Sequence, residues 1–301
     1  MSSFNEYDGR PVPASRALLT DELRGRMGFK GFVVSDSGAL SRMGNFGYAH
    51  DPVEQTAQAI RELTARGIHV VVATGRGLAE LSDYREELRC MSYGIIISGG
   101  LVYDFRKEEP IYAQTLPLED SLRLLAAGDD ERAMIHLLTI RESVARERDI
   151  FRMEQFDMAI YQDMYERVCV RLDDLESYVR AHAEEIAKIN LYHRSVESRE
   201  RNAQKLQDLN ATLVYAEVTG LEASPAGVTK AKGLEVLCEH LGIGLEDTVA
   251  IGDAPNDMDI LQAAGLSVAM GNATEDIRAI CDAVTEDNDH NGVLRAIERY
   301  F

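Results

Sequence analysis

Apolar residues along the chain gather in short blocks that predict buried strands, and helical segments separate several of these blocks. The run Ile68-His69-Val70-Val71-Val72-Ala73 is continuous and rich in β-branched residues, which is typical of a strand buried on both faces. Before it, apolar residues from Val53 to Leu63 recur on one helical face, and Gly67 ends the predicted helix. A helix that leads into such a strand through a short connection indicates a parallel α/β unit.

Strand and helix patterns of this kind occur both before and after a middle section whose pattern differs. From about residue 116 to 210 the chain is rich in charge, with a helical pattern over 172–186 and one candidate strand at 188–192. This section predicts a domain inserted between two halves of one α/β core. The other expected strands are 31–35, 95–97, 248–251 and 266–269, with a hairpin of 101–103 and 111–113, and further helices are expected near 78–88, 234–240 and 257–264.

Composition narrows the classes of function. The chain has 301 residues, of which 45% are hydrophobic, as in an ordinary globular protein with two domains or one core and an insertion. With 32 Lys and Arg against 51 Asp and Glu, the net charge of −19 disfavours nucleic acid and anionic membranes as partners. An anionic substrate would need a local device such as a metal ion, a helix N-terminus or a few placed cations. The sequence makes no prediction about oligomeric state.

The cysteines and the first residues favour a cytoplasmic location. The four cysteines form no CxxC pair, which indicates reduced thiols rather than a disulfide framework. Residues 1–10 are polar and lack the apolar stretch of a signal peptide, and no apolar run approaches the length of a membrane span. We therefore expect a cytoplasmic protein.

Two segments have the chemistry of a phosphate site. Thr74 and Gly75 follow the strand at 68–73, at the sheet edge where ligands bind, and a hydroxyl with neighbouring backbone N–H groups suits an oxyanion. The alternative is an ordinary turn. Lys230 opens the helix near 234–240, and a lysine beside a helix N-terminus suits phosphate. The alternative there is a solvated surface lysine.

A third segment has the chemistry of a metal site. Asp253, Asn256 and Asp257 follow the expected strand at 248–251. Hard oxygen ligands at this density suit Mg²⁺, which prefers a few carboxylates together with water and substrate phosphate. The alternative is a capped helix start, in which Asn256 or Asp257 satisfies free backbone N–H groups.

Taken in order, these segments resemble the haloacid dehalogenase-like hydrolases, specifically the Cof-type sugar phosphatases with an α/β cap. That family shows a strand ending in TGR, a hairpin of the type SNGALVYD, then GVSKG, and GDxxND followed by VAMGNA. One departure is Gly99, where the family usually has Asn. The resemblance covers about residue 51 to Phe301 and implies a Rossmann-like parallel-sheet core with an inserted α/β cap domain. The matching stretches are 74–76, 98–104, 227–230, 252–257 and 264–273.

The resemblance also implies a reaction and its residues. An Asp attacks the phosphorus of a small phosphorylated metabolite, such as a sugar phosphate, and water hydrolyses the resulting aspartyl-phosphate. Mg²⁺ and Lys230 would offset the charge on the transferring group. Asp253 would bind the metal, and Asp257 would act through water or as a second ligand. The phosphate-binding residues that the resemblance implies are Thr74, Gly75, Lys230 and Asn256.

The catalytic strand of that family is absent from this sequence. The family begins with a strand ending in DxDGT, whose first Asp is the nucleophile and whose second Asp protonates the leaving group. The chain contains no such motif and has Phe32-Val33-Val34-Ser35-Asp36-Ser37-Gly38 instead. This stretch, with 4–15, 18–20 and 28–36, resembles glycoside hydrolase family 3 over roughly the first 41 residues. In that family the Asp of SDW is the glycosidase nucleophile, and Ser37 replaces the Trp here.

The two resemblances together predict a join that preserves a core strand. Asp36 would fall where the phosphatase nucleophile belongs, as nucleophile and metal ligand, with Gly38 near the place of the second Asp. Three functions stay open: a Mg²⁺-dependent phosphatase impaired by the missing motif, a non-catalytic scaffold that binds phosphate or Mg²⁺, and a glycosidase. A glycosidase needs two carboxylates around the bond, which so short a segment does not supply. The expected domains are 1–41 (glycosidase-like), 42–115 (core), 116–210 (cap) and 211–301 (core).

Overall fold

The computed structural model describes residues 6–7, 10–11, 32–36 and 52–301. Gly38 and most of the glycosidase-like stretch lie outside these residues. The described residues form two large sheets, a first sheet of eight strands and a second sheet of six, besides the pair β1 (Glu6–Tyr7) and β2 (Arg10–Pro11). None of the described helices is long and apolar enough to span a membrane.

The first sheet is the predicted Rossmann-like core. Its strand order is β16-β15-β14-β3-β4-β5-β6-β7, and neighbouring strands run parallel from β16 to β5. The hairpin β6–β7 then adds two antiparallel strands at one edge, as the sequence predicts. The strands are β3 (Phe32–Asp36), β4 (Val70–Ala73), β5 (Tyr93–Ile96), β6 (Leu101–Asp104), β7 (Glu109–Ala113), β14 (Thr248–Gly252), β15 (Leu266–Ala269) and β16 (Ala283–Val284).

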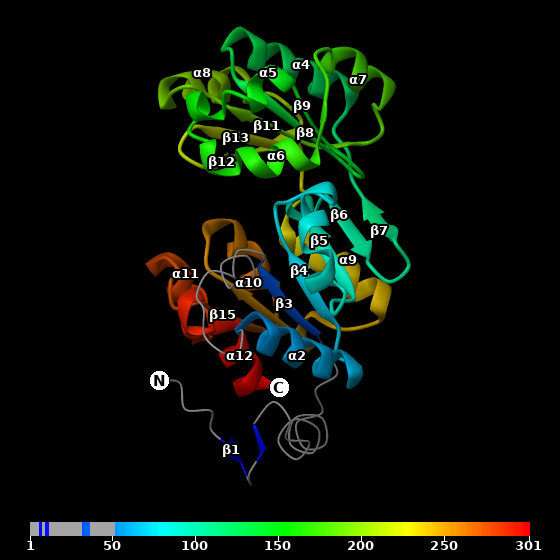
Figure 1. The fold of residues 1–301 in the computed structure, drawn as a ribbon, viewed down its shortest axis with the longest axis vertical. Coiled ribbons are helices and arrows are strands. Elements are labelled where there is room, and N and C mark those ends of the chain that lie inside the picture. Colours follow the sequence, from blue (N-terminus) through cyan, green and yellow to red (C-terminus); the bar gives the residue numbers. More distant parts are fainter. Residues whose placement is uncertain (1–5, 8–9, 12–31, 37–51) are drawn as a thin grey trace.

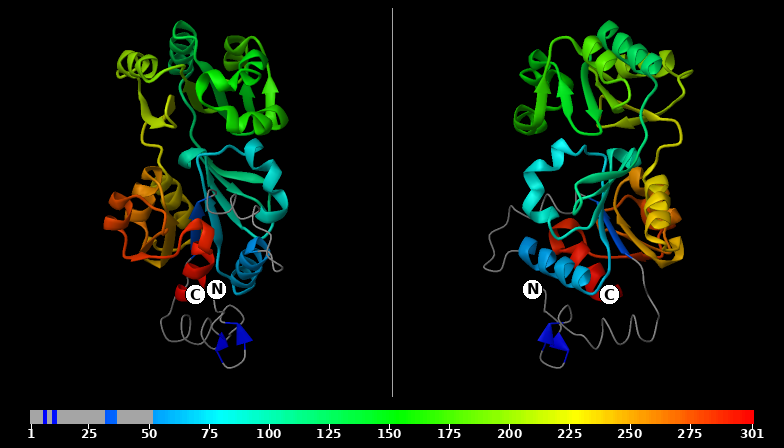
Figure 2. Two further views of the ribbon diagram at one scale, coloured as in Figure 1. Left: turned by 60° about the vertical axis from the view of Figure 1, so that its left-hand side comes forward. Right: turned by 90° about the vertical axis from the view of Figure 1, so that its right-hand side faces the viewer.

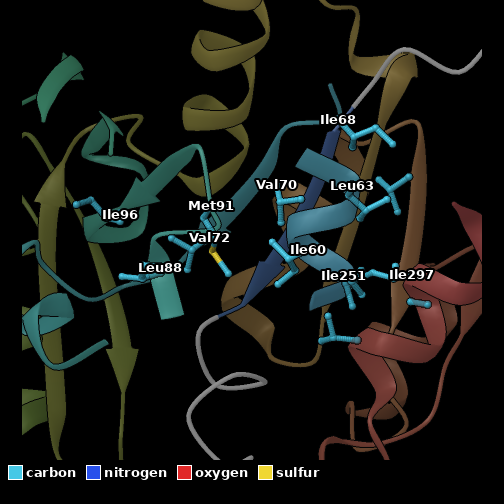
Figure 3. Close-up of a cluster of buried hydrophobic side chains, with 14 of the residues drawn as sticks. Ile60, Leu63, Ile68, Val70, Val72, Leu88, Met91, Ile96, Ile251 and Ile297 are labelled. Carbon is cyan, nitrogen blue, oxygen red and sulfur yellow. The ribbon is translucent and has the colours of Figure 1, made fainter. Parts of the chain in front are cut away.

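Strand β4 is buried on both faces, which confirms the prediction from its unbroken apolar run. Val70 and Val72 pack with α2 and α12 on one face (Figure 3), whereas Val71 and Ala73 pack with α9, α10 and α11 on the other. Each fully buried valine contributes about 1.5–3 kcal/mol, so the run fixes β4 in the middle of the core. The helices are α2 (Pro52–Ala65), α9 (Lys230–Leu241), α10 (Met258–Ala263), α11 (Glu275–Ile280) and α12 (Gly292–Tyr300).

The second sheet is formed by the middle of the chain and lies beyond one end of the first (Figures 1 and 2). Its strand order is β10-β9-β8-β11-β13-β12, and α4 (Leu118–Asp130), α7 (Leu175–Ala181) and α8 (Val196–Lys205) pack against its strands in one apolar cluster. The strands are β8 (Met134–Thr139), β9 (Ser143–Ala145), β10 (Cys169–Arg171), β11 (Ile186–Tyr192), β12 (Ala211–Ala216) and β13 (Gly220–Pro225). Several short helices complete it, including α5 (Glu147–Ile150) and α6 (Gln162–Val168).

The predicted domain boundary between 210 and 211 is wrong in this fold. Strands β12 and β13 form an antiparallel pair, and β13 also pairs with β11, so both strands belong to the second sheet. The chain returns to the core only after Pro225. The reason is that sheet membership is decided by a long-range partner, which the local pattern of residues 211–225 does not reveal. The helical pattern over 172–186 likewise gives a helix only at 175–181, because β11 begins at Ile186.

Candidate active site

The backbone of Asp36 lies at the carboxyl end of the central strand β3. This strand runs parallel to β4 on one side and to β14 on the other, with Asp36 opposite Ala73 and Ser35 opposite Ile251. The residue after Ala73 is Thr74, and β14 ends at Gly252, directly before Asp253. Since the strands are parallel, the polar segments that follow all three emerge at one edge of the sheet.

Lys230 and Asp257 form a buried ion pair at this edge. The two side chains are each 2% exposed, and Lys230 Nζ lies 2.5 Å from Asp257 Oδ1. Thr229 caps α9 by accepting a hydrogen bond from the Lys232 N–H, so Lys230 occupies the first turn of the helix. The alternative of a solvated surface lysine is therefore wrong for Lys230.

Asp257 also holds the loop that carries Asp253. Its Oδ2 accepts hydrogen bonds from the backbone N–H groups of Asp253, at 3.1 Å, and Ala254, at 3.2 Å. The capping interpretation thus describes part of what Asp257 does, and both of its oxygens already accept hydrogen bonds. This arrangement couples the position of Asp253 to the buried lysine.

Asp253 is half-buried and keeps a carboxylate at the same edge. Its Oδ2 accepts a hydrogen bond of 2.6 Å from Asn272 Nδ2, and Asn272 Oδ1 accepts one from the Asn288 N–H. The donor set fits a hard cation, because Asp253 offers a carboxylate beside the end of β3, where Asp36 stands. Among the side chains that the structure describes, no group of three His, Cys, Asp or Glu residues could hold a metal.

The segment after β4 is held rigidly. Thr74 is 2% exposed, its N–H donates to the Ile95 carbonyl, and its Oγ1 accepts a hydrogen bond from the Arg76 N–H. The Ser98 N–H donates to the Thr74 carbonyl, which ties this turn to the loop after β5. The position of the Thr74 hydroxyl is thus set by the backbone on both sides.

The loop after β5 has a strained backbone. The short helix η5 (Ile97–Gly99) has φ values of 53° at Ile97, 56° at Ser98 and 97° at Gly99. Such values are uncommon for any side chain and a true outlier for a β-branched one, and they cluster at functional sites. A Cβ at Gly99 would lie 2.0 Å from the Thr229 carbonyl oxygen, so glycine lets this loop touch the start of α9. An Asn at this position, as the family usually has, would require the two segments to move apart.

A cavity of about 260 Å³ opens between the two sheets beside these segments. Thr74, Gly75 and Asn256 line it from the core, and Asn256 is exposed. Its other wall comes largely from the second sheet and from the short helical segments between β9 and β10. The residues of that wall are Leu138, Met158, Tyr161, Met164, Tyr165, Lys188, Asn190, Tyr192, Glu217 and Glu222, and Arg76 and Glu80 complete the lining from the core.

Lys188 connects the two walls of the cavity. Its side chain is 1% exposed, pairs with Glu222 of β13, and donates a hydrogen bond of 3.2 Å to Ser98 Oγ in the core. A Cβ at Gly75 would lie 3.6 Å from Lys188 Nζ, so the ammonium group sits directly over the predicted phosphate loop. The second sheet therefore adds a cation, Lys188, to the site.

Burial shifts the pKa values of two neighbours of Lys188, Glu80 and His136. Burial raises the pKa of Glu80, although the Gly77 N–H donates to its carboxylate and Arg76 lies nearby. Burial also lowers the pKa of His136 to about 3, with a further contribution from Lys188. His136 is therefore a neutral ring at physiological pH and acts as a hydrogen-bonding group.

Reasoning from the sequence missed the residues of this wall. Lys188, Asn190 and Tyr192 alternate with apolar residues in the candidate strand at 188–192, which the structure confirms as β11. Polar side chains at every second position of a strand that is otherwise apolar indicate a face turned to a site. Asn272 was also missed, although it stands in the stretch that matches VAMGNA.

The comparisons with known proteins agree with this architecture. The family model of the haloacid dehalogenase-like hydrolases matches residues 47–297, and the chain belongs to that family. Phosphatase YwpJ of Bacillus subtilis is 29% identical over 276 residues, covering 83% of this chain and 93% of that protein. The 5-amino-6-(5-phospho-D-ribitylamino)uracil phosphatase YitU of B. subtilis is 25% identical, covering 82% and 90%. A crystal structure of a haloacid dehalogenase-like hydrolase from Bacteroides thetaiotaomicron superposes with a TM-score of 0.74 at 25% identity, covering 91% and 100%.

A second family model matches the beginning of the chain. The N-terminal domain of glycosyl hydrolase family 3 matches residues 1–70, a longer stretch than the 41 residues of the resemblance. The two matches overlap at 47–70, a stretch that contains α2. Strand β3 lies in the glycosidase-like part alone, yet it pairs as the central strand of the core.

Proposed function

We propose that this chain is a Mg²⁺-dependent phosphatase that acts on small phosphorylated metabolites, such as sugar phosphates, in the cytoplasm. The observation that carries the proposal is the register of β3, which ends in Asp36 between the strands that lead to Thr74 and Asp253. In a family whose members open with a nucleophilic Asp on this strand, Asp36 takes that position. The relatives support a phosphate ester as substrate, since one is named for a phosphorylated ribitylaminouracil.

The proposed reaction uses two steps at one carboxylate. An oxygen of Asp36 attacks the phosphorus, the bond between phosphorus and the ester oxygen breaks, and an aspartyl-phosphate forms. Water then attacks the phosphorus, which releases inorganic phosphate and regenerates the Asp36 carboxylate. The Thr74 hydroxyl and the Gly75 N–H donate to phosphate oxygens, and Asn256 orients the phosphate from the mouth of the cavity.

Charge in the transition state is offset by fixed groups of the chain. Lys230 supplies a buried positive charge at the start of α9, where the helix dipole has the same sign. Asp257 holds Lys230 and the backbone of Asp253 in place. Of its two predicted roles we favour the indirect one, because both oxygens already accept hydrogen bonds. Asp36 and Asp253 would hold Mg²⁺, which when bound offsets the charge of the phosphoryl group.

We assign the second sheet and its helices to the cap of this enzyme. The cap would run from about 116 to 225, so that β12 and β13 are included. Lys188 supports this assignment, because it reaches from β11 over the predicted phosphate loop and bonds to Ser98. A small metabolite that enters the cavity would be enclosed by both walls.

Because the second Asp of the DxDGT motif is missing, we expect this enzyme to be slow. Gly38 stands at its place, and the loss of a general acid costs roughly 10²–10⁴-fold in rate. Water must then protonate the leaving oxygen. We therefore expect turnover to be measurable chiefly for esters with good leaving groups, such as aryl phosphates.

Phosphate release from an aryl phosphate, with Mg²⁺ and after chelation, tests the proposal. We expect slow release that requires Mg²⁺ and is lost in Asp36→Asn, whereas Ser37→Ala serves as the matched control next to it. Release that is undetectable, or unchanged in Asp36→Asn, would overturn the proposal. Binding of phosphate without turnover would then favour a non-catalytic scaffold, and release of nitrophenol from an aryl glucoside would favour a glycosidase.

A further inference from the structure

One face of strand β11 turns polar side chains toward the cavity, and one of them has a hydrogen-bond acceptor that is unpaired among the described residues. Alternation along the strand turns Ile189 and Leu191 into the apolar cluster with α4 and α7, and it turns Lys188, Asn190 and Tyr192 toward the cavity. Asn190 is 4% exposed, and within the described part of the chain its Oδ1 has no hydrogen-bond partner. A buried acceptor left unpaired costs free energy, so a group that completes this bond is favoured at that position.

A buried network joins the Asn190 amide to His136. His136 Nε2 lies 2.6 Å from Ser143 Oγ, and its Nδ1 lies 3.0 Å from Tyr165 Oη and 3.3 Å from Asn190 Nδ2. With the proton of the neutral ring assigned to Nε2, Nδ1 is the acceptor and the Asn190 amide nitrogen is the donor. The carbonyl oxygen Oδ1 is therefore the atom left for a molecule in the cavity.

The charges around the cavity disfavour a second anion. Among the lining residues that the structure describes, Glu217 and Glu222 are carboxylates, Glu80 is a buried carboxyl group whose pKa burial raises, and Arg76 and Lys188 are cations. Lys188 is already paired with Glu222, and Arg76 contacts the Met164 sulfur at 3.1 Å and lies over the Tyr84 ring. A second negative group on a ligand would face carboxylates with no cation left unengaged, which selects against it.

Acceptor oxygens also stand on this wall. Glu217, Glu222 and Asn190 Oδ1 can accept hydrogen bonds from a ligand, and the Tyr161 hydroxyl already donates to Glu217. A ligand that brings several hydroxyl groups supplies donors for these oxygens. The cavity of about 260 Å³ suits a leaving group the size of a small metabolite.

We propose that Asn190 determines specificity by accepting, through Oδ1, a hydrogen bond from a hydroxyl group of the substrate's leaving group. The cavity thereby selects polyhydroxylated monophosphates that carry no second anionic group. For the position of the phosphate, this inference rests on the proposed function. The inference adds that Asn190, a residue of the second sheet, recognises the leaving group of the substrate.

Calorimetric binding to the full chain in the Asp36→Asn form, which suppresses turnover, tests the inference. The probes are glucose 6-phosphate, phenyl phosphate, which has no hydroxyl group on its leaving group, and fructose 1,6-bisphosphate. We expect glucose 6-phosphate to bind about tenfold more tightly than the other two. Asn190→Leu should reduce the preference over phenyl phosphate by roughly 3–10-fold, the range for one net hydrogen bond.

Two further variants serve as controls. Asn190→Asp retains an acceptor oxygen and should keep the preference for glucose 6-phosphate over phenyl phosphate. Asn210→Leu makes the same exchange at an exposed position before β12 and should change nothing. An unchanged preference in Asn190→Leu, equal binding of the bisphosphate, or no binding of any ester would overturn the inference.

Turnover of phenyl phosphate by the unmodified chain separates the two proposals. If that turnover is absent while the binding preference and its dependence on Asn190 hold, only the proposed function fails. If turnover is present while Asn190→Leu leaves the preference unchanged, only the specificity role fails.

Discussion

Removal of the Lys230 ammonium group should destabilise the protein strongly. In Lys230→Met the carboxylate of Asp257 stays 2% exposed and retains two backbone donors at 3.1 and 3.2 Å, but it loses the cation at 2.5 Å. Breaking a buried pair by removing one partner costs about 3–5 kcal/mol. Because two donors remain, we place this loss near the lower end, at about 3 kcal/mol.

Thermal and denaturant unfolding measure this loss directly. For a protein near this size, about 2–4 °C of Tm corresponds to 1 kcal/mol, so Lys230→Met should lower Tm by roughly 6–12 °C. The double variant Lys230→Met with Asp257→Asn should be less destabilised than the two single losses added together, because no buried charge is left unpaired.

An exposed pair in α7 provides the comparison. Arg180 and Glu176 are 55% and 62% exposed, and Arg180→Ala should cost about 0.5 kcal/mol or less. A loss in Lys230→Met as small as this, or strictly additive losses in the double variant, would refute the view that the buried pair holds this edge of the core.

Three further outcomes follow from the same geometry. The pKa of His136 is near 6.5 in the unfolded chain and about 3 in the folded protein, so the unfolded chain binds more protons between these values and stability falls as the pH is lowered; by pH 5 the loss amounts to about 2 kcal/mol, and a wild-type slope that persists in His136→Gln would contradict it. Gly99→Ala should lower Tm more than Gly67→Ala, because a Cβ at Gly99 meets the Thr229 carbonyl at 2.0 Å whereas nothing lies within 4 Å at Gly67; equal losses would exclude the clash. Gly38→Asp should raise phosphate release by roughly 10²–10⁴-fold, and an equal gain in Gly38→Asn would exclude an acid role.

The core strands show how far local pattern reaches. The mostly apolar runs at 68–73, 248–251 and 266–269 predict strands that the structure confirms as β4, β14 and β15. A run of this kind is typical of a strand buried on both faces, so these strands and their parallel arrangement could be predicted from the local order of residues. The polar segments after these strands could be predicted for the same reason, because parallel strands end at one edge.

The second sheet shows where local pattern stops. Strands β8, β9 and β10 lie in a stretch that the sequence describes as charged and helical, whereas β12 and β13 follow it in a part predicted as core. The pairing of β8, β11 and β13 joins residues far apart in the chain. The local signal of a short strand is weak, since its partners as well as its own residues decide whether it forms. The alternation at Lys188 and Asn190 marks one face of β11, but the strands that join β11 in the wall of the cavity are set by pairing between distant parts of the chain.

The sequence by itself determined the core strands and the positions of Thr74 and Asp253 directly after two of them. It also predicted that a strand resembling a second family replaces the missing DxDGT strand. Only the tertiary structure decided that β3 enters the centre of the sheet, with Asp36 opposite Ala73. It also decided that Lys230 is buried against Asp257 instead of solvated. The physical reason is the same in both cases: strand order and the desolvation of a charge depend on partners distant in sequence, which only the packed chain brings together.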